Sequence, residues 1–67
     1  MNDTDMEKLE FLVDEYYIPE VVASLNSICR LRADDIRGTD KEAAKKFEMY
    51  SDILNDARAK IDAAFQG

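Results

Sequence analysis

The last third of the chain carries an uninterrupted apolar repeat that constrains the fold more than any other feature. Its members recur at alternating spacings of four and three residues: Ala43, Phe47, Tyr50, Leu54, Ala57, Ile61 and Ala64. This spacing places one apolar stripe along an α-helix. Ile53 and Phe65 flank the stripe and widen it, which favours a bundle of three or four helices over a two-stranded coiled coil.

The residues just before this stripe predict a tight turn between two helices. Arg37 suits the negative end of a preceding helix, and Gly38 can adopt the left-handed conformation that ends one. Thr39 and Glu42 have the spacing of a capping box at the start of the next helix. Because the connection is so short, we expect antiparallel helices on its two sides.

A further helix is predicted nearer the N-terminus, where Thr4 and Glu7 also match a capping box. Pro19 disfavours helical geometry at Ile18 and suits the first position of a new helix. The apolar face changes direction there by roughly 150° on a helical wheel. Either the chain kinks at Pro19 so that both faces meet one core, or the first helix serves a second partner.

The sequence therefore predicts an all-α fold, an antiparallel helical hairpin with a shorter N-terminal helix kinked at Pro19. We expect a single helical domain over residues 1–67, with helices at about 5–17, 19–37 and 40–66, as a three-helix bundle or a homodimeric four-helix-like bundle. The predicted core consists of Leu9, Val13, Tyr16, Val22, Leu25, Ile28, Phe47, Tyr50, Leu54, Ala57 and Ile61.

The net charge of −6 is concentrated at the N-terminus. Residues 1–20 hold seven acidic residues against one lysine, whereas residues 21–67 hold eight acidic and eight basic residues. This distribution disfavours direct binding to nucleic-acid phosphates and to anionic membranes. It favours a basic protein surface as the partner.

The sequence lacks the residue combinations that form a zinc site or an activated thiol. The chain has no histidine and a single cysteine, Cys29, so we expect no zinc site, no cofactor and no activated thiol nucleophile. No apolar run reaches the roughly 18 residues of a membrane span. The first residues lack the basic and then apolar pattern of a signal peptide. We therefore expect a cytoplasmic protein that is not an enzyme.

An aromatic pair within the acidic segment is the candidate partner-binding site. Phe11 and Tyr17 are difficult to bury in a monomer of this size, and Glu7, Glu10 and Asp14 lie on the face opposite the apolar stripe. Aromatic side chains are enriched at the centres of protein interfaces. These five residues are expected to bind a protein partner or to form a homodimer contact.

The size of the chain and its Arg37-Gly38-Thr39-Asp40 turn resemble the small co-chaperones of type III secretion needle proteins. This resemblance implies a helical hairpin that shields a partner's helix, and it assigns no functional residues. We thus expect a small acidic interaction module, an adaptor or co-chaperone-like protein that forms a homodimer. The alternative is an acidic inhibitor that mimics nucleic acid, of the phage-encoded kind.

Overall fold

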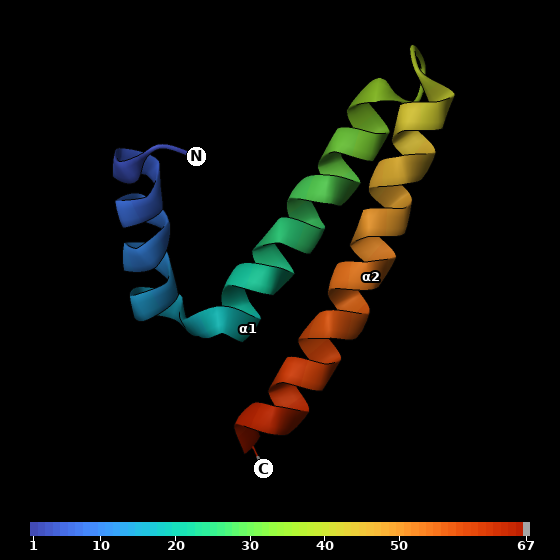
Figure 1. Cartoon of the computed structure of the whole chain (residues 1–67). Coiled ribbons are helices and arrows are strands. Elements are labelled where there is room, and N and C mark those ends of the chain that lie inside the picture. The colour runs from blue at the N-terminus through green and yellow to red at the C-terminus, as the bar shows by residue number, and fades with distance from the viewer. Residues whose placement is uncertain (67) are drawn as a thin grey trace.

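The computed structural model describes residues 1–66, which form two helices packed side by side (Figure 1). Helix α1 covers Asp3–Ile36 and helix α2 covers Lys41–Gln66. Because α1 is bent at Tyr17, we call residues 3–16 the arm and residues 18–66 the hairpin. The predicted all-helical antiparallel hairpin is confirmed.

Both helices begin on side-chain caps that differ from the predicted threonine caps. The Asp5 N–H donates to Asn2 Oδ1 over 2.8 Å, so α1 starts two residues earlier than expected. The Ala43 N–H donates to Asp40 Oδ1 over 3.0 Å at the start of α2. Asparagine and aspartate cap helices at least as well as threonine does, and here Asn2 caps α1 and Asp40 caps α2.

The turn between the helices is closed by backbone hydrogen bonds rather than by a left-handed glycine. The N–H groups of Thr39 and Asp40 donate to the Ile36 carbonyl over 3.0 and 2.7 Å, and the Thr39 hydroxyl donates to the same oxygen over 3.2 Å. No glycine among the described residues has a positive φ, so the conformation predicted for Gly38 is wrong. The hydrogen bonds to Ile36 satisfy a carbonyl that a helix end leaves free.

The bend in α1 lies at Tyr17, which has φ 66° and ψ 161°, while the surrounding residues are helical. The predicted kink at Pro19 is therefore displaced by two residues, and Pro19 lies inside the helix that follows. A proline ring in a helix clashes with the carbonyl four residues earlier, here that of Glu15. A bend at Tyr17, between these two residues, separates them. We call residues 17–19 the elbow.

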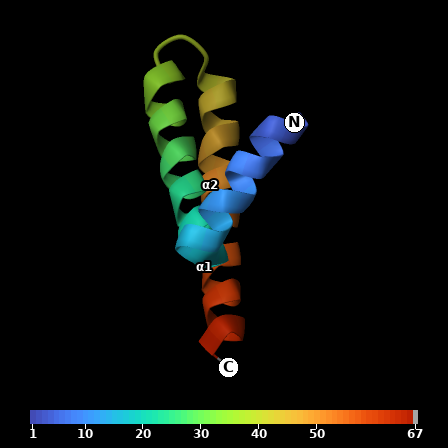
Figure 2. The ribbon, with the colours of Figure 1, turned by 90° about the vertical axis from the view of Figure 1, so that its left-hand side faces the viewer.

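The arm diverges from the hairpin and does not complete a three-helix bundle. Figure 1 shows the arm and α2 on opposite sides of residues 18–36, and Figure 2 shows the arm crossing the hairpin at an angle. The radius of gyration is 13.8 Å, whereas a compact chain of this length has one of about 11 Å. The predicted bundle is therefore not formed within this single chain.

The two helices of the hairpin meet along a line of small residues. Ala33 is fully buried, and Ala44 and Ser51 are almost so. The Ser51 hydroxyl accepts a hydrogen bond from Arg30 Nε over 3.1 Å and donates to Asn26 Oδ1. Small side chains let the two backbones approach closely, and this polar contact fixes how the helices are aligned. We call the line through Ala33, Ala44 and Ser51 the seam.

The predicted core is only partly correct. Leu9, Val13, Val22, Phe47, Leu54, Ala57 and Ile61 are half-buried, whereas Tyr16, Leu25, Ile28 and Tyr50 are exposed. The seam runs along one flank of the apolar stripe rather than through its middle. Half of the stripe therefore faces away from the partner helix.

Because the helices are in close contact at the seam, a larger side chain there should lower the free energy of unfolding. Ala33→Leu should destabilise the chain by about 1–3 kcal/mol, because the extra atoms force the helices apart. Ala59→Leu, at an exposed alanine of α2, is the control and should change stability by less than about 0.5 kcal/mol. Urea unfolding followed by circular dichroism, at one fixed protein concentration, measures both. Equal effects of the two substitutions would contradict a tight seam.

The hydroxyl of Ser51 should matter more than that of an exposed serine. Ser51→Ala removes the hydroxyl that links Asn26 to Arg30, which should cost about 0.5–1.5 kcal/mol, because Asn26 is half-buried and Arg30 is open to water. Ser27, whose hydroxyl donates to the Ala23 carbonyl at the surface, supplies the control Ser27→Ala. The same urea titration compares the two variants. A Ser51→Ala variant as stable as the wild type would show that the polar contact contributes nothing.

Candidate protein-interaction surface

The seam divides the hairpin into two sides of opposite character. Residues 18–36 carry an apolar stripe that includes Ile18, Leu25 and Ile28, and α2 carries the stripe described above. On a helical wheel with 100° per residue, each stripe is centred about 90° from the seam residues of its own helix. Viewed from the N-terminus of each helix, the two offsets have the same direction. Because the helices are antiparallel, equal offsets in the same sense bring both stripes to one side of the hairpin. The charged residues next to the seam fall on the other side.

The charged side is held together by ion pairs near the turn. Arg37 lies 3.2 Å from an Asp34 carboxylate oxygen and 2.5 Å from one of Glu48, so it links α1 to α2. All three side chains are about half exposed or more, and such pairs contribute at most about 1 kcal/mol. These ion pairs link the two helices on this side, which is the solvated side of the hairpin.

The apolar side has no cover among the described residues, and we call it the hairpin face. It consists of Ile18, Leu25, Ile28, Tyr50, Leu54 and Ile61. Ile28 is 50% exposed, and Ile18, Leu25 and Tyr50 are exposed to a similar degree. The Tyr50 ring stands at 87° to that of Phe47, with 5.9 Å between the ring centroids. Clusters of exposed large apolar side chains are typical of interaction surfaces, so the hairpin face is a candidate for one.

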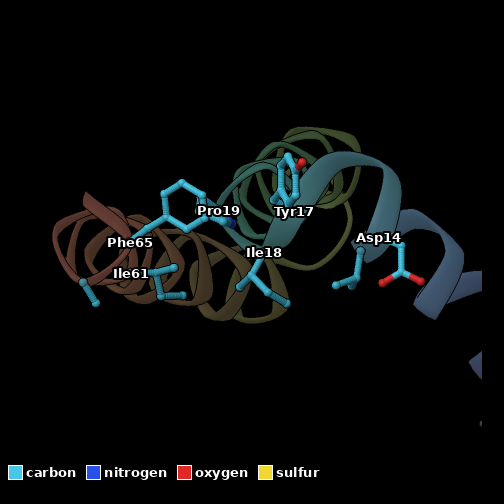
Figure 3. A pocket seen from close by; sticks show the side chains of 8 residues that line it. Asp14, Tyr17, Ile18, Pro19, Ile61 and Phe65 are labelled. Atoms are coloured by element: carbon cyan, nitrogen blue, oxygen red, sulfur yellow. The ribbon is translucent and has the colours of Figure 1, made fainter. Parts of the chain in front are cut away.

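A hollow of about 520 Å³ lies at the elbow end of the hairpin face (Figure 3). It is lined by Val13, Asp14, Tyr17, Ile18, Pro19, Ile61, Ala64 and Phe65. Figure 3 shows Ile61 and Phe65 reaching from α2, with Ile18 opposite them and Asp14 farther away on the arm. The rings of Tyr17 and Phe65 are 6.1 Å apart and inclined at 46°. The hollow can hold an apolar side chain of a partner.

The five predicted partner-binding residues do not form one site. Tyr17 and Asp14 line the elbow hollow. Glu7 and Phe11 line a second shallow hollow on the flank of the arm, and Glu10 borders neither. Phe11 and Tyr17 are 64% and 63% exposed. Both aromatic residues are thus accessible, as a binding role requires, but they lie in different hollows.

Sequence reasoning missed the contribution of the C-terminal end of α2. Phe65 is 70% exposed, yet its ring lies beside Tyr17 at the elbow. α2 is longer than the segment 18–36 against which it packs, so its last turns extend beyond that segment and reach the elbow. The four-residue spacing of Ile61 and Phe65 places both on one helix face, and this spacing is the signal that could have identified them.

Two basic residues accompany the hairpin face. Arg32 lies within it on α1 and Lys46 at its margin on α2, both exposed. Neither makes an ion pair with any of the described residues. Cations beside an apolar surface add electrostatic selectivity for an acidic partner.

Other kinds of site are not found in the described part of the chain. Residues 1–66 contain no cluster of three or more histidine, cysteine, aspartate or glutamate side chains that could hold a metal ion. None of their helices is both long and apolar enough to cross a bilayer. Cys29 is unpaired and half-buried between the seam and the hairpin face. The hairpin face and the elbow hollow are therefore the surfaces on which a function can be argued.

Comparisons of this chain with protein-family models, with curated proteins and with solved structures found no match.

Proposed function

We propose that this chain is a small, acidic, non-enzymatic protein–protein interaction module of the adaptor or co-chaperone type, which acts as a homodimer. The hairpin face is the surface that the module presents. A second helical element lying on this face turns the hairpin into a bundle. That element is the chain's own arm in a three-helix bundle, or a second copy in a dimeric four-helix-like bundle.

The observation that carries this proposal is the exposed area. The chain exposes 5515 Å². A folded monomer of its mass, 7.7 kDa, exposes about 4,300 Å², so the surplus is about 1,200 Å². A standard protein interface removes about 800 Å² from each partner. The surplus is therefore large enough to form a stable interface.

The exposed surface includes many large apolar side chains, among them Ile28 and Phe65, which favours a protein partner. At about 25 cal/mol per Å², burial of a few hundred Å² of apolar surface contributes several kcal/mol. A chain of 67 residues buries too little surface to be very stable alone, and association adds the missing burial. A homodimer is the simplest partner, because the same surface is present on every copy.

A homodimer formed by the hairpin face should be broken by a charge placed on that face. Ile28→Glu is expected to weaken the dimer at least about tenfold, because removing the carboxylate and the neighbouring Arg32 from water costs more than their mutual attraction returns. Leu31→Glu, three residues along α1 and outside the face, is the matched control because Leu31 is also exposed. Light scattering over a range of concentrations measures the mass of each variant. A wild-type chain that stays monomeric throughout would refute the homodimer.

The acidic arm supports a second candidate function, an inhibitor that mimics nucleic acid. Glu7, Glu10 and Asp14 are all exposed on an arm that stands away from the hairpin. A row of exposed carboxylates can occupy a basic cleft in place of phosphates. Such binding depends on charge, whereas binding through the hairpin face depends on apolar contact.

The second candidate predicts displacement of DNA from basic proteins. At low salt the chain should release a fluorescent duplex from a DNA-binding protein, with salt weakening the effect steeply. The triple variant Glu7→Gln, Glu10→Gln, Asp14→Asn should lose the activity, while Ile28→Glu should keep it. Fluorescence anisotropy measures the released duplex. Absence of displacement from a panel of basic DNA-binding proteins would argue against mimicry.

A further inference from the structure

We propose that the hairpin face is occupied by the arm of a second copy of this chain, so that two protomers exchange arms. Each hairpin then completes a three-helix bundle with the arm of its partner. This inference rests on the homodimer proposed above and names the segment that forms its interface.

The arm has the length and the apolar stripe that the hairpin face requires. Its 14 residues, from Asp3 to Tyr16, span about 21 Å, and residues 18–36 of the hairpin span about 28 Å. Met6, Leu9, Val13 and Tyr16 recur at spacings of three and four residues, so they share one side of the arm. Met6 and Tyr16 are exposed, and Leu9 and Val13 are half-buried. The arm thus carries an apolar stripe that its own hairpin leaves largely uncovered.

The elbow favours exchange over closure of the arm on its own hairpin. Tyr17 has φ 66° and ψ 161°, a region of backbone geometry that is populated almost only by glycine and costs about 1–3 kcal/mol for other residues. In the structure this bend holds the arm on the side of residues 18–36 opposite α2, away from its own hairpin face, so that its apolar stripe is open to a second copy (Figure 1). Short strained hinges are known to promote the exchange of segments between identical chains.

Charge selects the pairing of arm with hairpin. Residues 3–16 hold six acidic residues and one lysine, a net charge of −5, so two arms repel each other. Residues 18–66 hold nine acidic and eight basic residues, a net charge of −1. Arg32 and Lys46 on the hairpin face make no ion pair with the described residues of their own chain. Contact between an arm and this face is therefore less repulsive than contact between two arms, and the arm's carboxylates, which lie opposite its apolar stripe, stay in solvent.

The lone cysteine provides a direct test of this arrangement. An arm that packs antiparallel to residues 18–36 brings Met6 level with Cys29, because each is about twelve residues from the elbow. We mix wild-type chain with the double variant Met6→Cys, Cys29→Ser, oxidise with a copper catalyst and identify the linked peptides by mass spectrometry. A disulfide between the introduced cysteine and wild-type Cys29 can form only between two copies.

The matched control is Phe11→Cys, Cys29→Ser, since Phe11 lies on the opposite side of the arm. A disulfide requires the two Cα atoms to come within about 7 Å, so the Met6 variant should give about tenfold more crosslinked heterodimer than the control. Equal yields from the two variants would overturn the arm exchange. An intramolecular disulfide in Met6→Cys with Cys29 retained would also overturn it, because the arm would then close on its own hairpin.

Light scattering on the same samples separates this inference from the proposed function. A dimer that gives no specific crosslink refutes the arm exchange and leaves the homodimer intact. A monomer that gives no crosslink refutes both. A dimer with the specific crosslink supports both.

Discussion

Close contact along the seam is the constraint on which the other features of the hairpin depend. Ala33 and Ala44 let the two backbones approach, and the hydrogen bonds of Ser51 to Arg30 and Asn26 fix their alignment. Once this line of contact is set, the 100° step of an α-helix decides where every other side chain lies. The charged residues fall on one side and the apolar stripe on the other. The exposed hairpin face is thus a consequence of where the small residues occur.

The elbow determines whether the arm covers the hairpin face. Pro19 is incompatible with a straight helix because its ring meets the carbonyl of Glu15, and the bend at Tyr17 separates them. The bend turns the arm back along the hairpin without bringing it into contact along its length (Figure 1). Two apolar stripes are then left exposed, one on the hairpin and one on the arm. They are of similar length, and only one of them is strongly acidic.

The hairpin could be predicted from the sequence because its signals are local. A short turn with capping residues and a long apolar repeat define two antiparallel helices whatever surrounds them. The identity of the caps could not be resolved, because Asn2 lies two residues before Thr4 and Asp40 directly follows Thr39, and these threonines are equally plausible caps. The core was misassigned for a different reason. Periodicity locates the middle of an apolar stripe, whereas contact follows the smallest residues, here Ala33 and Ser51 on its flank.

The candidate site was the least accessible to sequence reasoning, since it depends on how distant segments meet. Tyr17 was identified as an exposed aromatic residue, but its neighbour Phe65 lies 48 positions later in the sequence, at the end of α2. The charge pattern adds a second constraint. An N-terminal segment that carries nearly all of the net charge cannot pair with a copy of itself, so it needs either solvent or a surface bearing unpaired cations. The hairpin face, with Arg32 and Lys46 beside its apolar residues, is such a surface. Net charge and apolar burial therefore both favour contact of an arm with a hairpin face over contact of one arm with another.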